Sequence, residues 1–220
     1  MFDKKFLKDP KKRFSDRVEK YIKYRPSYPQ KIIEFLKEKK ILSKDSVIAD
    51  IGSGTGIFAA NLSSEKRMII CLDPSVGMLE EAKKRYNLLV TGTAENLPFR
   101  SKIFDFIYMV TVIEFLVNPL KALNNIRNNL KKGSPILILF IGKESQWGRY
   151  YSKLAEERHP IFIHAKFFTF DEIRQELELA GYRILGSIDT LNTYKQTKFK
   201  GAKKGLKSKK GAIIVKANAE

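Results

Sequence analysis

The sequence predicts one α/β domain built on a doubly wound, mostly parallel sheet. Its 220 residues suit a single domain, and 43% hydrophobic residues suffice for a sizeable core. Short apolar runs alternate with segments of helical spacing along most of the chain. These runs are apolar throughout rather than at every second position, which is typical of parallel strands covered by helices on both faces.

The middle of the chain carries most of this alternation. We expect strands at 47–51, 68–72, 88–91, 104–110 and 135–141. We expect helices at 57–62, 76–86 and 120–130, which lie between most of these strands. Repeats of strand, helix and strand place consecutive strands in parallel.

The N-terminal part is expected to be helical. A polar, amphipathic stretch at 10–24 stops at Pro26 and Pro29, because two prolines prevent a helix from continuing. A second helix is expected at 30–39, with its apolar residues on one side.

The C-terminal part begins with an aromatic and polar stretch at 142–168. A helix then starts with Thr169 or Asp171 as its N-cap and stops at Gly181. The chain closes with strands at 182–190 and 212–217, separated by a Lys-rich loop at 192–211.

Charge is unevenly placed along the chain. The net charge is +18, of which residues 1–40 and 190–220 each carry +8 and residues 41–189 carry +2. Basic ends of this kind attract polyanions such as nucleic acid or an anionic surface, and they also serve solubility alone. Both interpretations stay open at this point.

Several classes of protein are excluded by composition. A single cysteine, Cys71, excludes an internal disulfide and a thiolate-rich metal site. His159 and His164 are the only histidines, which makes a zinc centre improbable. No apolar run approaches the roughly 20 residues of a membrane span, and the N-terminus has no signal peptide. We therefore expect a soluble cytoplasmic protein without a metal.

A glycine-rich turn carries the strongest functional signal. Gly52, Ser53, Gly54 and Gly56 follow the strand 47–51 directly and precede a helix, and such a turn lets a ligand approach the backbone closely. The next strand ends at Asp73, which lies 23 residues after Asp50. An acid there accepts hydrogen bonds from both hydroxyls of a ribose. The pattern therefore predicts a cofactor that contains a nucleoside.

Two details favour S-adenosylmethionine over a dinucleotide. Position 57 is Ile where the pyrophosphate-binding pattern requires its third glycine. S-adenosylmethionine has no phosphate but does carry an ammonium group, and Asp50 lies where it can help to bind the methionine end, partly through water. We expect the turn, Asp50 and Asp73 to form this cofactor site.

The segment 91–108 adds a resemblance to a known family. Thr93-Ala94-Glu95-Asn96-Leu97-Pro98-Phe99, followed by Phe104-Asp105-Phe106, resembles class I S-adenosylmethionine-dependent methyltransferases of the ubiquinone and menaquinone biosynthesis type. The resemblance runs from about residue 14 to 141, and more loosely to the C-terminus. It implies a Rossmann-like, seven-stranded methyltransferase fold, with residues 1–40 as an N-terminal helical lid and 41–141 as the cofactor-binding core.

The same resemblance implies roles for single residues. The family carries an acid before Ala94 that contacts the adenine amino group, and this sequence has Thr93 there, so that its hydroxyl, the Ala94 backbone or Glu95 must serve adenine instead. The other positions that match the family site are Tyr21 and Arg25 in the lid, Val110 and Thr111 beside the sulfonium, and Met78 near the ribose or adenine. For Tyr21, Arg25 and Met78, ordinary packing or a surface charge is the alternative.

The methyl acceptor is expected on the side of a cap formed by residues 142–168. "Glu-Ser-x-x-Gly-Arg" at 144–149 resembles a branch described as possible small-amine methyltransferases. Trp147 and His164 are our acceptor-pocket candidates, with aromatic core beneath the cap as the alternative. Glu114 can bind an amine or take its proton, or it caps a turn in solvent.

The sequence lacks the features of enzymes for two kinds of methyl acceptor. The segment after strand 104–110 lacks the Asn/Asp-Pro-Pro-Tyr/Phe pattern of enzymes that methylate the exocyclic amines of bases, and arsenic methylation needs several cysteines. We expect methyl transfer by in-line displacement to a small molecule, and whether this acceptor is anionic stays open. The alternatives are an RNA or protein methyltransferase that docks through its basic ends, and a non-catalytic cofactor-binding regulatory module.

Overall fold

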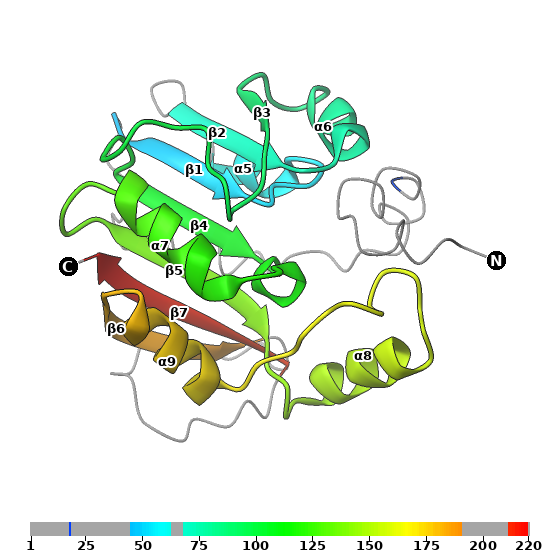
Figure 1. Cartoon of the computed structure of the whole chain (residues 1–220). Helices are drawn as coiled ribbons and strands as arrows, with labels where there is room; N and C mark the ends of the chain where they lie inside the picture. The colour runs from blue at the N-terminus through cyan, green and yellow to red at the C-terminus, as the bar shows by residue number, and fades with distance from the viewer. Residues whose placement is uncertain (1–17, 19–44, 63–67, 191–210, 220) are drawn as a thin grey trace.

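The computed structural model describes Val18 and residues 45–62, 68–190 and 211–219 (Figure 1). The expected N-terminal helices, including the lid with Tyr21 and Arg25, lie outside the described residues. The Lys-rich loop at 192–211 also lies outside them, apart from its last residue. The fold and the site below are built from the remaining chain.

A twisted sheet forms the centre of the molecule. Its strands are β1 (Val47–Ile51), β2 (Met68–Asp73), β3 (Leu89–Thr91), β4 (Phe106–Val110), β5 (Pro135–Ile141), β6 (Tyr182–Thr190) and β7 (Ala212–Ala219). Within the described residues these seven strands lie in the order β3-β2-β1-β4-β5-β7-β6. β1 to β5 pair in parallel, while β7 runs antiparallel between β5 and β6. The predicted mostly parallel, seven-stranded sheet is confirmed.

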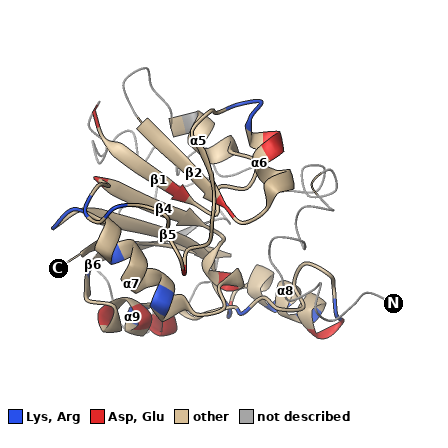
Figure 2. Ribbon diagram, turned by 45° about the horizontal axis from the view of Figure 1, so that its top comes forward, with Lys and Arg blue, Asp and Glu red and all other residues tan. Residues whose placement is uncertain are grey.

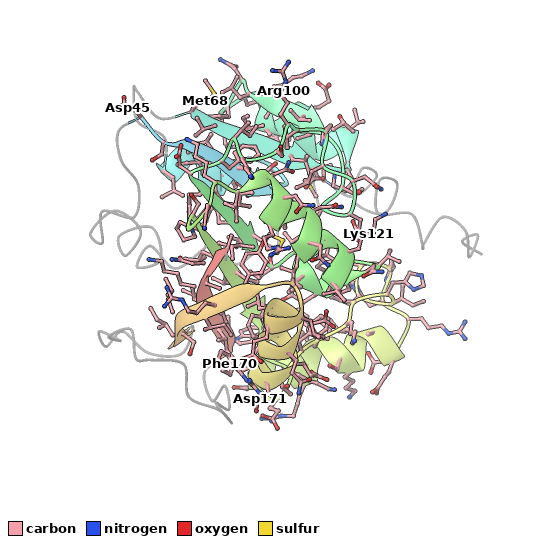
Figure 3. All side chains as sticks on the ribbon, turned by 60° about the vertical axis from the view of Figure 1, so that its left-hand side comes forward. Asp45, Met68, Arg100, Lys121, Phe170 and Asp171 are labelled. Carbon is pink, nitrogen blue, oxygen red and sulfur yellow. The ribbon has the colours of Figure 1, made fainter. Side chains whose placement is uncertain are left out.

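Helices cover both faces of this sheet, with α7 (Pro119–Asn129) and α9 (Phe170–Leu179) on one face and α5 (Ile57–Leu62) on the other. The described residues also form α6 (Val76–Ala82), α8 (Gln146–Glu156) and the short 3-10 helix η1 (Ile113–Phe115). Thr169 caps α9 in a capping box with Glu172, which decides between the two expected N-caps. Figure 3 labels Phe170 and Asp171 in the first turn that follows this cap.

α8 is the element that the sequence interpretation missed. It begins after Ser145, whose hydroxyl accepts a hydrogen bond from the Gly148 N–H at 2.9 Å. Its sequence has an amphipathic spacing, with Trp147, Tyr151 and Leu154 one turn apart, but the many aromatic and polar residues suggested a loop. In Figure 1 the helix lies to one side of the sheet, beyond the end of β5.

The core consists of two apolar layers, one on each face of the sheet. Residues of α7 and α9 pack on one layer, and residues of α5 pack on the other. β1 contributes to both layers, because Ala49 and Ile51 face α7 while Ile48 faces α5. Each of these side chains is fully buried. In the described residues, no helix has the length and apolar character that a bilayer span requires.

Candidate functional site

The carboxyl ends of the parallel strands meet at one edge of the sheet, where the strand order reverses between β1 and β4. Ligands of open α/β sheets bind at such a switch point. β1 and β2 each contain one acidic residue, Asp50 and Asp73, at or next to the carboxyl end of the strand, and Figure 2 shows the two strands side by side. The predicted cofactor residues of the core are therefore gathered by the topology.

The glycine turn is held against the end of β2. The N–H groups of Gly52 and Ser53 both donate to the Leu72 carbonyl, at 2.7 and 3.0 Å. Gly52 has φ +71°, and a Cβ there would lie 2.4 Å from Cγ2 of Val112. Only glycine satisfies this backbone angle and this close approach together. The turn therefore depends on Gly52 for its shape.

Gly54 has a different environment from Gly52. Its φ is +54°, and among the described residues no heavy atom lies within 4 Å of where its Cβ would stand. Its N–H donates to Oδ2 of Asp73 at 2.9 Å. The backbone at Gly54 is thus open on the side away from the protein, as a close ligand approach requires.

We predict that Gly54→Ala leaves the protein folded but weakens cofactor binding at least tenfold, roughly the effect of 1.4 kcal/mol. The methyl group would occupy the open space, while the strain of a left-handed alanine costs only about 1 kcal/mol. Thermal unfolding and calorimetry with S-adenosylhomocysteine measure the two effects. Gly133→Ala is a matched control, since Gly133 also has a positive φ and open space. Equal binding by both variants would contradict the prediction.

Asp73 is a buried carboxylate with acceptor capacity to spare. Oδ1 accepts the Ser75 N–H at 2.8 Å and Oδ2 accepts the Gly54 N–H, and the residue is 8% exposed. Burial raises its pKa to about 6, against the lowering effect of the two N–H donors. A carboxylate offers about four lone-pair directions, so two remain for further donors. This arrangement fits the two hydroxyls of a ribose.

Asp50 lies beneath the turn, on the α5 face of the sheet. It is 2% exposed and is flanked across the sheet by Cys71 of β2 and Tyr108 of β4. A carboxylate in so dry a setting interacts strongly with a nearby cation, because water screens it little. Asp50 therefore fits the ammonium end of the cofactor predicted from the sequence.

Further predicted residues line the same edge through main-chain contacts. The Gly92 N–H donates to the Asp73 carbonyl at 3.2 Å, which brings Thr93 and the buried Ala94 next to the end of β2. Met78 is also buried, and its N–H donates to the Ser75 hydroxyl at 3.2 Å. A chain of contacts thus joins these residues to Asp73.

Glu95 is engaged in holding a loop. Oε1 of Glu95 accepts the Val117 N–H at 3.0 Å, and its carbonyl accepts a hydrogen bond from the Asn125 side chain. These contacts join the 93–99 segment to the start of α7. Of the three adenine-side candidates, Glu95 therefore also ties down the segment that contains Thr93.

Thr111 has an unusual backbone at the end of β4, directly after the buried Val110. Its φ is +54°, a left-handed conformation that is costly for a β-branched residue. Its N–H donates to the Leu139 carbonyl at 2.8 Å, and Oγ1 donates to the Val110 carbonyl at 2.7 Å. Strain of this kind gathers at functional sites, in keeping with the position expected beside the sulfonium.

Glu114 is buried in η1, and the expectation that it caps a turn in solvent is wrong. It is 1% exposed, and Oε1 accepts the Ile141 N–H at 2.7 Å. Its carbonyl accepts the Lys166 N–H at 2.7 Å, which ties the cap to the end of β4. Oε2 has no hydrogen-bond partner among the described residues, and burial raises the pKa of Glu114 to about 7.

Aromatic rings from α8, η1 and the following loop form a cluster in the cap. Trp147 is 43% exposed, and its ring stacks on that of Tyr151 with 5.9 Å between the ring centroids. The ring centroids of Tyr151 and Phe162 lie 4.6 Å apart. Phe162 in turn lies 6.3 Å from Phe115, the neighbour of Glu114. The cluster therefore links the ring of Trp147 to η1. Because Trp147 is partly exposed, the cluster is not fully buried as a core would be.

The two histidines differ in position. His164 is exposed. The ring of His159 lies 5.3 Å from Phe162, and its Nδ1 accepts the Ile161 N–H at 3.3 Å. His159 therefore packs against the aromatic cluster, and His164 stays a prediction for the acceptor pocket.

Comparison with known proteins agrees with this geometry. A family model described as "Methyltransferase domain" matches residues 49–138. The "Uncharacterized protein MJ1123" of Methanocaldococcus jannaschii is 27% identical over 175 residues, 74% of this chain and 83% of that protein. A Campylobacter jejuni ubiquinone/menaquinone biosynthesis C-methyltransferase is 33% identical over 116 residues, 49% of each chain. The chain spans 49% of the length of its Mycobacterium tuberculosis relatives.

Solved structures extend the likeness to nearly the whole chain. A Thermotoga maritima S-adenosylmethionine-dependent methyltransferase, described as a possible histamine N-methyltransferase, has a TM-score of 0.74 at 28% identity and covers 94% of this chain and 98% of its own. A putative methyltransferase in complex with the Haloferax volcanii Trm112 activator has a TM-score of 0.69 at 15% identity, with 97% of each chain covered, and shows the fold alone. The methyltransferase domain at 49–138, the relatives named as methyltransferases and the likeness to solved structures support a class I S-adenosylmethionine-dependent methyltransferase, with S-adenosylmethionine as its cofactor.

Proposed function

We propose that this enzyme transfers the methyl group of S-adenosylmethionine to a small-molecule acceptor held between the cap and the ends of β4 and β5. The observation that carries the proposal is the pair formed by Gly54 and Asp73, an open backbone beside a buried carboxylate with free acceptor capacity. Bound there, the cofactor supplies a methyl group activated by its sulfonium.

The proposed cofactor roles divide among the residues of the edge. Asp73 accepts the ribose hydroxyls, Asp50 attracts the ammonium, and the turn from Gly52 to Gly56 gives room for the ligand. Thr93, Ala94 and Glu95 serve the adenine, Met78 packs beside it, and Val110 and Thr111 border the sulfonium. The lid residues Tyr21 and Arg25 are proposed to close the site.

The proposed acceptor site uses the cap. Trp147 supplies an exposed ring face, and His164 adds a polar group at the surface of the same segment. Glu114, with one unpartnered buried oxygen and a pKa near neutrality, is suited to take a proton from an arriving amine or hydroxyl. An amine acceptor is supported by the likeness to the Thermotoga protein described above.

A methyl-transfer assay tests the proposal. Protein and tritiated S-adenosylmethionine are incubated with cell extract that has been separated into small-molecule, RNA and protein pools. We expect label in the small-molecule pool and none there with Asp73→Asn. Label in the RNA or protein pool would overturn the small-molecule acceptor, and absence of label from all pools would favour a regulatory module.

Trp147 gives a second readout for the acceptor. It is the only tryptophan of the 220 residues, so its fluorescence reports on the cap alone. A labelled fraction that contains the acceptor should change this fluorescence in the presence of S-adenosylhomocysteine. Unchanged emission with a confirmed acceptor would place that acceptor away from Trp147.

A further inference from the structure

A row of buried polar side chains crosses the sheet at the level of Asp50. Asp50 of β1 pairs in register with Cys71 of β2 and with Tyr108 of β4. Residues in register on parallel neighbours point to the same face, and these three side chains face α5. Cys71 and Tyr108 are fully buried and Asp50 is 2% exposed. The phenol of Tyr108 therefore shares a dry environment with the carboxylate of Asp50.

Packing explains the ring of Tyr108 but not its hydroxyl. The ring lies 5.1 Å from Phe58 and 5.8 Å from Phe106, and Phe106 fills the same face two residues earlier without a hydroxyl. The Tyr108 hydroxyl has no hydrogen-bond partner of good geometry among the described residues. A buried hydroxyl without a partner destabilises a fold, so phenylalanine would suit the packing better.

Asp50 is the charged group that faces this hydroxyl. Burial and then the charge of Asp50 raise the pKa of Tyr108 well above its ordinary value, so the phenol keeps its proton. A protonated phenol is a donor, and an ionised carboxylate is an acceptor only. Hydrogen bonds at ligand sites are often long until the ligand is bound and then shorten. The pair is therefore suited to form a charge-assisted hydrogen bond.

We propose that Tyr108 is a positioning residue for Asp50, whose carboxylate it orients toward the ammonium of the methionine part of the cofactor. The proposal rests on the proposed role of Asp50 in the cofactor site. The Tyr108 hydroxyl donates to the Asp50 carboxylate and so fixes its orientation. The hydroxyl lowers the stability of the protein without cofactor and raises its affinity for the cofactor.

Tyr108→Phe and a pair of ligands test this role. Calorimetry is done with S-adenosylhomocysteine, which carries the ammonium, and with 5′-methylthioadenosine, which shares the nucleoside but lacks the amino-acid part. We expect the Kd for S-adenosylhomocysteine to rise about five- to tenfold, less than for loss of a direct hydrogen bond to a charged group because Tyr108 acts only through Asp50, and the Kd for methylthioadenosine to stay unchanged. The melting temperature should be unchanged or higher.

Tyr86→Phe is the matched control. Its phenol lies in the same part of the core and accepts the Ile69 N–H at 3.0 Å. Losing that bond should lower the melting temperature and leave both ligand affinities unchanged. If Tyr108→Phe weakens the binding of both ligands equally, or of neither, the positioning role is wrong.

Asp50→Asn separates the two proposals. This variant should weaken the binding of S-adenosylhomocysteine. In the double variant Tyr108→Phe should weaken binding little further, since both substitutions act on one contact. Failure of the wild-type protein to bind either ligand would overturn the proposed cofactor site. Binding that is weakened by Asp50→Asn but not by Tyr108→Phe would overturn only the inference about Tyr108. Binding insensitive to Asp50→Asn would overturn the ammonium role and this inference together.

Discussion

Asp73→Asn is expected to weaken the binding of S-adenosylhomocysteine by about 100-fold or more. The carboxylate accepts two N–H donors already and is proposed to accept two ribose hydroxyls as well. Hydrogen bonds to a charged group contribute roughly 1.5–3 kcal/mol each, so that loss of the charge weakens several contacts together. Calorimetry at pH 7.5 measures the effect.

Asp105→Asn is the control for this change. Asp105 also accepts a main-chain N–H, from Val47 at 2.9 Å, and it forms an ion pair with Lys131. It precedes β4 and so lies at the opposite end of the parallel strands from Asp73. We expect Asp105→Asn to lower the melting temperature without changing the Kd. Similar Kd values for the two variants would contradict a ribose contact at Asp73.

The pH dependence of cofactor binding follows from the same carboxylate. Burial raises the pKa of Asp73 to about 6, so the side chain is ionised at pH 7 and mostly protonated at pH 5. Ribose hydroxyls donate best to the ionised form, so affinity is present above pH 6 and is lost as pH falls through it. We expect the Kd to rise about tenfold from pH 7 to pH 5, one pK unit below the midpoint. In Asp73→Asn this dependence should disappear.

The sheet and the cofactor turn were predictable from the sequence because both depend on local signals. Continuous apolar runs show strands that are buried on both faces, and β1 and β5 have the predicted bounds. The glycines of the turn are required by local backbone angles, as Gly52 illustrates. The Thr169 capping box is likewise a pattern of four consecutive residues.

The cap and its contacts were not predictable in the same way. α8 has only Gly148 among its buried residues, and its apolar face starts with Trp147 and Tyr151, aromatic residues that also occur in loops, so composition alone did not distinguish the helix from a loop. Burial of Glu114 depends on the Ile141 N–H, 27 residues away, and on the segment around Lys166. Contacts between distant segments leave no periodic signal, and a glutamate in a short turn is usually exposed.

Glu114→Gln is expected to stabilise the free protein at alkaline pH while reducing methyl transfer. Burial raises the pKa of Glu114 from its ordinary 4.5 to about 7. Below pH 4.5 the carboxyl is protonated in both the folded and unfolded states, and it costs nothing. As pH rises to 7 the unfolded chain ionises first, so stability falls, and above pH 7 the full cost of about 3 kcal/mol remains.

Glutamine keeps the acceptor for the Ile141 N–H and removes the ionisable group. We therefore expect the free energy of unfolding to rise by about 3 kcal/mol at pH 8 and to be unchanged at pH 4, as measured by urea titration. Glu144→Gln is the matched control in the cap, because Glu144 is exposed, and it should change neither value. Equal stability of Glu114→Gln and wild type at pH 8 would contradict the buried charge.

The activity of the same variant tests why a costly carboxylate occupies this position. A general base contributes about 100-fold or more to rate, so kcat for a protonated acceptor should fall by that amount in Glu114→Gln, while the Kd for S-adenosylhomocysteine stays unchanged. In the wild type the rate should rise with pH through about 7, where Glu114 ionises. A variant that is both more stable and fully active would show that Glu114 only anchors the cap. A stable but slow variant would show that the stability lost at Glu114 serves the proton transfer.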